Sequence, residues 1–145
     1  MLPDLEYAAL RFETFADEVL RPVATPVVAP LAVTVAQFEG RPTYDEITAI
    51  PESGFAKVEP GWRWGPVWST AWFRLQGDLP EAMSGRSVHL RFDSGTEALL
   101  WRDGAPFHGF DFNRDRAAII DAAEPGASVD LLVEAACNMP LGIST

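Results

Sequence analysis

The chain has 145 residues, close to the usual size of one domain, and a chain of this length buries roughly 70% of its unfolded surface without help from a disulfide or a metal. Hydrophobic residues make up 48% and charged residues 22%, which excludes a disordered chain. Eleven basic against 21 acidic residues give a net charge of −10, so neither nucleic acid nor an anionic membrane is an expected partner.

The amino-terminal residues predict one helix over residues 4–20. Apolar residues recur there three or four positions apart and form one stripe: Leu5, Ala9, Phe12, Ala16 and Val19. Asp4 can cap the helix, and Pro22 ends it near Leu20. Acidic residues in this segment argue against a signal peptide, and no run reaches the length of a membrane span, so we expect a cytoplasmic protein.

From residue 31 onward the pattern predicts strands. Five runs are short and apolar or alternate with polar residues: "LAVTVAQF" (31–38), "TAWFRLQG" (70–77), "SVHLRFDS" (87–94), "EALLWRD" (97–103) and "VDLLVEAAC" (129–137). Asp103-Gly104 predicts a tight hairpin, because both residues tolerate positive φ. We expect residues 1–30 to form the helix and an extended, proline-containing connector, and residues 31–145 to form one all-β, antiparallel jelly-roll sandwich.

Few residues in the sequence are suited to catalysis or metal binding. His89 and His108 are the only histidines. Alternation places Val88 and Leu90 on one face of their strand and His89 on the outward face, and we expect His108 to lie in the aromatic turn. Neither histidine has partners spaced for a zinc site. Cys137 is the single cysteine, and we expect a buried, inert thiol. No serine-nucleophile or phosphate-loop motif is present. We therefore predict no catalytic and no metal-binding residue in this chain.

The stretch "DFNRD" (111–115) begins like a calcium-binding loop. The match then fails, since Arg116 stands where glycine is needed and Ala122 where a glutamate belongs. We expect Asp111 and Asn113 to cap a turn by bonding local backbone amides.

Four of the five tryptophans fall within "GWRWGPVWSTAWF" (61–73). Trp62, Trp64, Trp68 and Trp72 are separated by even numbers of positions and would share a face in an extended chain, although Pro66 makes the first half a loop. Two interpretations stay open. The rings pack into one end of the sandwich core, or they form an exposed surface that stacks on sugars or docks on another domain.

Three segments carry a resemblance to a known family: "PGWRWGPVWSTAWFRL" (60–75), "GRSVHLRFDSGTEALLWRDGAPFHGFDFNR" (85–114) and "VDLLVEAACN" (129–138). In order and spacing they resemble the amino-terminal β-sandwich of family 38 α-mannosidases of the bacterial and cytosolic branch. More loosely, the strand plan is similar to galactose-binding-domain-like jelly rolls.

The resemblance implies a retaining, zinc-dependent exo-glycosidase that releases terminal α-linked mannose. In that family a later α/β domain holds the zinc and the nucleophilic aspartate, and no position of this sequence matches those motifs. We therefore expect a fragment that is inactive alone, with no cofactor of its own, and whose partner is the missing catalytic domain.

The expected contact residues, for that domain or for sugar, are Trp62, Trp64, Trp68, Phe110, Asp111, Asn113 and Arg114. Phe110 and Phe112 would anchor the interface, and in isolation the patch would be able to drive self-association. The alternative is an autonomous carbohydrate-binding module with an exposed tryptophan face, which would take mannose-containing glycans as its partner.

Overall fold

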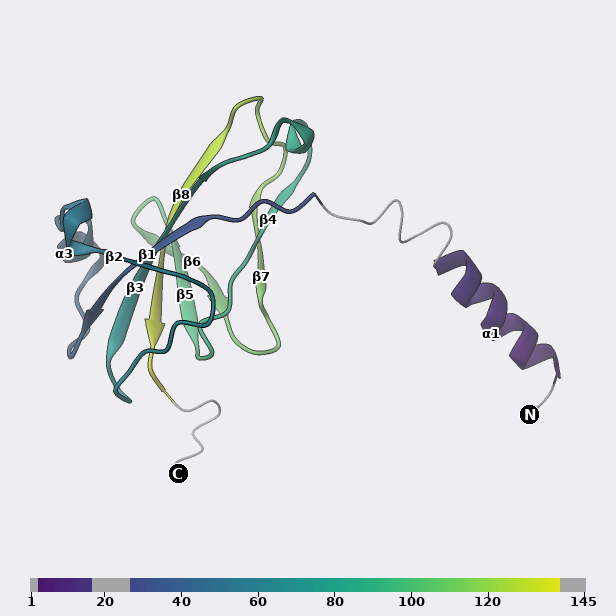
Figure 1. Cartoon of the computed structure of the whole chain (residues 1–145), viewed down its shortest axis with the longest axis horizontal. Helices are drawn as coiled ribbons and strands as arrows, with labels where there is room; N and C mark the ends of the chain where they lie inside the picture. The colour runs from purple at the N-terminus through teal and green to yellow at the C-terminus, as the bar shows by residue number, and fades with distance from the viewer. Residues whose placement is uncertain (1–2, 17–26, 139–145) are drawn as a thin grey trace.

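The computed structural model of the chain describes residues 3–16 and 27–138. The described residues form eight strands. In Figure 1, α3 and the pair β4 and β7 lie on opposite sides of the remaining strands. The helical elements are α1 (Pro3–Phe15), α3 (Tyr44–Thr48), η2 (Glu52–Gly54) and η3 (Glu81–Met83). The strands are β1 (Ala32–Phe38), β2 (Ala56–Val58), β3 (Thr70–Asp78), β4 (Val88–Arg91), β5 (Ala98–Arg102), β6 (Ala105–Phe110), β7 (Arg116–Ile120) and β8 (Ser128–Ala136).

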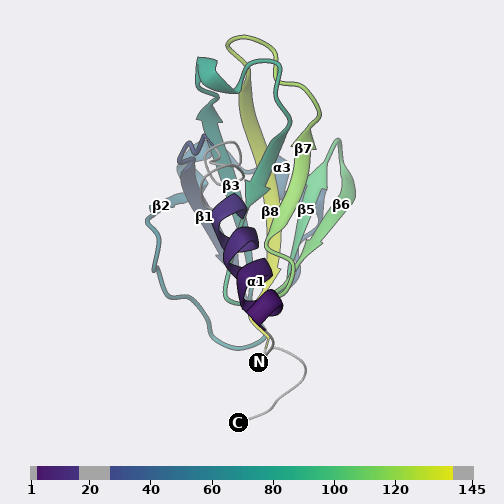
Figure 2. The same cartoon turned by 90° about the vertical axis from the view of Figure 1, so that its right-hand side faces the viewer.

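The strands form two sheets, and every strand pairing in them is antiparallel. Six strands form the larger sheet in the order β2-β1-β3-β8-β5-β6. β4 and β7 pair with each other in a second sheet, which lies against one face of the larger sheet (Figure 2). The long central strands β3 and β8 are in register from Thr70 opposite Ala136 to Asp78 opposite Ser128. This arrangement confirms the predicted antiparallel jelly-roll sandwich.

Alternation along β3 assigns its side chains to the two faces of the larger sheet. Ala71, Phe73 and Leu75 point toward β4 and β7 and belong to the main core, where Leu75 is 2% exposed. Trp72 and Arg74 point to the opposite face, which we call the outer face.

The segment 39–55 covers part of the outer face and builds a second, smaller core. Ala36, Ile47, Phe55 and Trp72 are its buried members, and Trp72 is fully buried. The helix α3 begins at a capping box, in which the Thr43 side chain accepts from the Glu46 amide and the Glu46 carboxylate accepts from the Thr43 amide. Ile47, one turn in, then projects onto the sheet.

The structure refines the predicted helix at the amino terminus. The helix begins at Pro3, so Asp4 lies in its first turn and not at the cap, as suits a proline at the first helical position. Phe12, a member of the predicted apolar stripe, is 76% exposed. The predicted end of the helix at Leu20 lies outside the described residues.

Most predicted strands are confirmed, and the hairpin is confirmed in detail. Asp103 and Gly104 have φ of +52° and +78° between β5 and β6. β6 is the second strand of the predicted hairpin, whereas β2, β7 and α3 were not predicted. His89 lies outward on β4 as alternation implied, whereas His108 lies within β6 and not in a turn. The free thiol of Cys137 is half-buried, not fully buried as predicted.

Candidate functional site

The predicted contact residues gather at one end of the sandwich. Four strands have an end side by side here: β3 and β5 start, and β8 and β6 finish. Thr70 pairs with Ala136, and Ala98 pairs with both Ala135 and Phe110. The loop 59–69, which carries Trp62, Trp64 and Trp68, leads into the start of β3, and the Asp111–Arg114 turn follows the end of β6.

Trp62 and Trp64 pack edge-on against the same ring. Their centroids lie 6.3 and 6.1 Å from that of Phe73, at interplanar angles of 80° and 84°. The Trp64 indole also donates a 3.1 Å hydrogen bond to the Ser94 carbonyl. Trp64 therefore acts as a structural tie between two loops, while Trp62 keeps 39% of its surface exposed.

The four tryptophans do not share one face, contrary to the extended-chain expectation. Trp72 lies on the outer face, opposite to Phe73 and the two tryptophans that pack on it. Trp68 adopts a positive φ of +72°, and its backbone amide donates to the Cys137 carbonyl at 2.7 Å. This local turn leaves the Trp68 ring 77% exposed.

The Asp111–Arg114 turn caps itself as predicted for Asp111. Its carboxylate accepts the Asn113 amide at 2.8 Å, and the backbone groups of Asp111 and Arg114 bond each other in both directions at 3.1 and 3.0 Å. Asn113 and Arg114 are exposed. Nothing in the geometry assigns them a ligand, so their role at an interface stays a prediction.

Phe110 corrects the predicted site, because it belongs to the main core. It is 3% exposed and packs on Phe92 at 5.6 Å, which in turn packs on Phe73 at 5.3 Å. Alternation in β6 points Phe110 inward, so it cannot anchor a neighbouring domain. Phe112, two residues further along and outside the strand, is 65% exposed.

The exposed aromatic rings at this end are therefore Trp62, Trp68 and Phe112, which we call the aromatic rim. Beside Phe112, the loops 93–97 and 111–113 enclose a hollow of about 240 Å³ lined by Asp93, Glu97 and Asp111. Within residues 3–16 and 27–138, no group of three or more His, Cys, Asp or Glu side chains is placed to hold a metal ion. The rim thus offers an exposed aromatic surface for packing.

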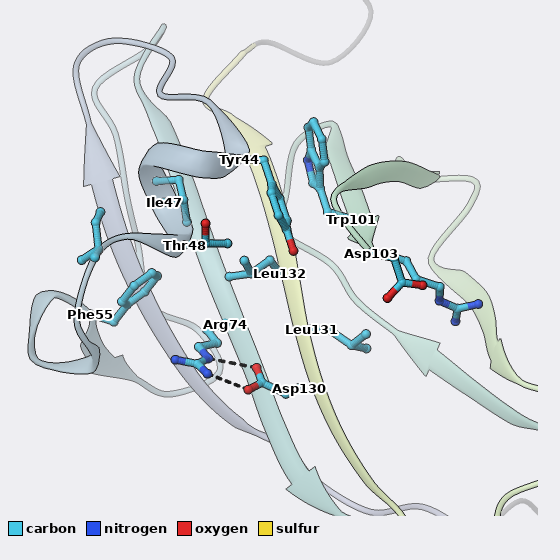
Figure 3. Close-up of a pocket in the computed structure, with 12 residues that line it drawn as sticks. Tyr44, Ile47, Thr48, Phe55, Arg74, Trp101, Asp103, Asp130, Leu131 and Leu132 are labelled. Atoms are coloured by element: carbon cyan, nitrogen blue, oxygen red, sulfur yellow. Dashed lines mark hydrogen bonds and ion pairs between the residues drawn. The ribbon is translucent and has the colours of Figure 1, made fainter.

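A second candidate site lies on the outer face of the larger sheet, and sequence analysis did not predict it. A hollow of about 580 Å³ opens between α3 and η2 on one side and the β5–β6 turn on the other (Figure 3). Tyr44, Trp101 and Asp103 stand on one side of it, and the Arg74–Asp130 pair lies on its floor (Figure 3).

The floor of this outer-face hollow is a bidentate ion pair. Arg74 donates from Nε and Nη2 to the two carboxylate oxygens of Asp130 at 2.9 and 2.6 Å, and Gln76 donates to the same carboxylate at 3.1 Å. The hydrogen bonds from Arg74, and next those from Gln76, lower the pKa of Asp130 against the opposing effect of burial. The same pairing raises the pKa of Arg74.

Tyr44 and Trp101 form the aromatic wall of the hollow, and Trp101 is also bonded and packed on its other side. The Tyr44 and Trp101 rings lie 5.2 Å apart at 25°, and Trp101 also packs on Trp72 at 5.6 Å. The Trp101 indole donates to the Glu134 carboxylate at 3.3 Å, and that carboxylate, 7% exposed as a residue, accepts from Arg41 Nε at 2.6 Å. The hydrogen bond and the stacking fix the orientation of Trp101.

The comparison with known proteins then identifies the family. The family described as "Alpha-mannosidase, jelly roll domain" (Ams1-like) matches residues 28–145, more than half of the chain. The chain belongs to this family. Its jelly roll domain is 36% identical over 96 residues to alpha-mannosidase 2C1 of Mus musculus and 38% identical over 92 residues to alpha-mannosidase 2C1 of Homo sapiens.

These relatives are much longer than the jelly roll domain. The matches cover 63% and 61% of this chain but 9% of each relative, and alpha-mannosidase G of Dictyostelium discoideum is 25% identical over 57% of the chain and 8% of its own length. In the described part of the domain, no helix is both long and apolar enough to cross a membrane.

Proposed function

We propose that this jelly roll domain is a non-catalytic part of a longer α-mannosidase that hydrolyses terminal α-linked mannose. We further propose that it packs, through the aromatic rim, on the catalytic domain of that chain. Family membership and relatives named alpha-mannosidases support the first part. The second part is supported by the exposure of Trp62, Trp68 and Phe112, at 39%, 77% and 65%, on the loop that leads into β3 and on the turn that follows β6.

The exposed rings of the aromatic rim favour contact with another protein surface. Exposed large aromatic rings that lie together are typical of interaction sites, and tryptophan is enriched among residues that dominate binding energy. Asp111, Asn113 and Arg114 stand beside Phe112 and would supply the polar border that such interfaces have. The exposed rim would also allow the isolated domain to self-associate.

The proposal assigns zinc to the catalytic domain, because the described residues offer no cluster that fits the metal. It places the longer protein in the cytoplasm, as the family resemblance implies. A net charge of −10 argues against nucleic acid and anionic membranes as partners.

A complementation assay tests this proposal. The domain and the remainder of the longer chain are expressed separately, mixed, and assayed on a chromogenic α-mannoside. We expect no activity from the domain alone and restored activity on mixing. Since truncating a buried interface tryptophan costs about 2 kcal/mol or more, Trp68→Ala should raise the concentration of domain needed for half-maximal restoration about 30-fold.

Phe107→Ala is the matched control. Phe107 is 43% exposed, but it lies on β6 near the Asp103-Gly104 turn, toward the opposite end of β5 from the rim. The control should complement like the unaltered domain. A remainder that is fully active and stable without the domain, or equal effects of the two substitutions, would contradict an interface at the rim.

A further inference from the structure

We infer that the outer-face hollow is a binding site for a neutral saccharide, separate from the aromatic rim. This inference does not depend on the interdomain packing proposed above, because the two surfaces share no residue. It rests on the size of the hollow, the balance of its charges, its aromatic wall, and the fixed orientation of the groups that line it.

The size and construction of the hollow suit a small ligand. A volume of about 580 Å³ lies within the range of about 300 to 1,000 Å³ that is typical of small-molecule sites. Its walls come from α3, the residues Ile50 and Phe55 that flank η2, β3, β8 and the β5–β6 hairpin, so segments distant in sequence converge on one point. Ile47 and Phe55, both buried, hold the α3–η2 wall against the sheet.

The charges that line the hollow cancel and therefore favour an uncharged ligand. Arg74 and Arg102 supply two positive charges, and Asp103 and Asp130 supply two negative charges. An additional carboxylate, that of Glu52, lies 3.5 Å from Arg74 Nη1 with most of its side chain exposed. An anionic ligand would meet these carboxylates, and a cationic ligand would meet the two guanidinium groups.

The same groups can still bond a ligand that carries hydroxyls. A guanidinium has five N–H donors, and Arg74 uses two of them on Asp130. Asp103 adds carboxylate acceptors from the turn, and the Tyr44 hydroxyl, which points toward the hollow in Figure 3, both donates and accepts. Bonds from hydroxyls to charged groups are stronger than neutral ones.

The aromatic wall completes the match to a sugar ring. A pyranose has a rim of hydroxyls and faces made largely of C–H groups, so it needs polar partners around it and an apolar surface beside it. The stacked rings of Tyr44 and Trp101, each half-buried, offer such a surface next to the charged floor. Because Glu134 and Trp72 already hold Trp101 in place, little freedom is lost when a ligand binds.

The test is a residue-resolved titration of the ¹⁵N-labelled chain followed by NMR. The probes are methyl α-D-mannopyranoside, an α-linked mannobiose and, as a charged comparator, mannose 6-phosphate. We expect saturable shifts with a dissociation constant on the order of 1 mM for the neutral sugars. The largest shifts should fall on the Trp101 indole and on the amides of Ile47 and Leu132. Mannose 6-phosphate should bind at least fivefold more weakly.

Two conservative substitutions locate the site without disturbing the fold. Tyr44→Phe keeps the stacked ring but removes the hydroxyl, and Asp103→Asn keeps a residue that tolerates the positive φ of the turn. The pair together should weaken binding of the mannobiose at least tenfold, with the rest of the spectrum unchanged. Trp68→Ala is the matched control and should leave the affinity unchanged.

Three outcomes would overturn the inference. The first is the absence of saturable shifts up to 100 mM of either neutral sugar. The second is a set of shifts that falls on Trp62 and Trp68 and disappears in Trp68→Ala, which would support sugar stacking at the rim instead. The third is tighter binding of mannose 6-phosphate, which would show an anion site. None of these results bears on the complementation assay, so the two proposals fail separately.

Discussion

Replacement of Ile47 by alanine tests whether the wall of the outer-face hollow can open while the sandwich stays folded. Ile47 is 1% exposed and belongs to the smaller core with Trp72, on the opposite face of the sheet from the main core. Truncating a buried isoleucine to alanine costs about 2 to 5 kcal/mol, and we expect about 3 kcal/mol here. Because α3 packs on the smaller core and not on the main core, this cost should appear as local opening of residues 39–55.

Amide hydrogen exchange measures that opening directly. The amides of Ile47, Ala49 and Ile50 donate to the carbonyls of Thr43, Asp45 and Ile47 and report on α3. A loss of about 3 kcal/mol corresponds to exchange faster by a factor on the order of 100 at these amides. The amides of β3 and β8 should change far less, because their protection comes from the main core.

Ile119→Ala is the matched control for the Ile47 substitution. Ile119 is 8% exposed and lies on β7 in the main core, so its truncation should accelerate exchange across β3 and β8 together with α3. Equal acceleration of α3 and of the central strands in Ile47→Ala would refute a separately opening wall. Unchanged exchange in α3 would refute the role of Ile47 as its anchor.

Three further predictions concern stability. Leu100→Ala removes a fully buried side chain from β5 and should lower the free energy of unfolding in urea by about 3 to 4 kcal/mol, whereas Leu99→Ala at the neighbouring half-buried position should cost less than half of that. Gly104→Ala should cost about 1 kcal/mol by the same measurement, because the turn needs φ of +78° while the added Cβ meets only an ordinary 3.8 Å contact. Hydrogen bonds from Arg74 lower the pKa of Asp130, so its contribution to stability is complete above its ordinary pKa near 3.9 and is lost as the pH falls through the lower folded value. The advantage of the unaltered domain over Asp130→Asn in urea should therefore be present at pH 6 and fall away below pH 4, and an advantage that persists at pH 2 would contradict the pairing.

Local patterns were sufficient to predict much of the sandwich. Alternation in β4 assigned Val88 and Leu90 to the core and His89 to solvent, and Asp103-Gly104 marked the hairpin, because both signals depend on neighbours in sequence. The sequence also contains a signal for α3 that was not used, the capping box of Thr43 and Glu46. At five residues it is too short for helical periodicity to show.

The outer-face hollow could not be predicted from one sequence, because it depends on strand order and register. Arg74 and Asp130 are 56 positions apart and meet only because β3 pairs with β8 and leaves both side chains on the same face. Trp101 reaches that face because it alternates with the buried Leu100 along β5 and pairs with Leu132 of β8. Phe110 was misassigned to the rim for the same reason, since the inward direction of β6 follows from its pairing with β5.

The most direct test of the proposed interdomain role is hydroxyl-radical footprinting of the isolated domain and of the longer α-mannosidase chain that contains it. If the aromatic rim packs on the catalytic domain, we expect oxidation of Trp68 and Phe112 to fall at least fivefold in the longer chain, while oxidation of Phe107 stays the same. Equal oxidation of Trp68 in the two proteins would show that nothing covers the aromatic rim and would contradict the proposal.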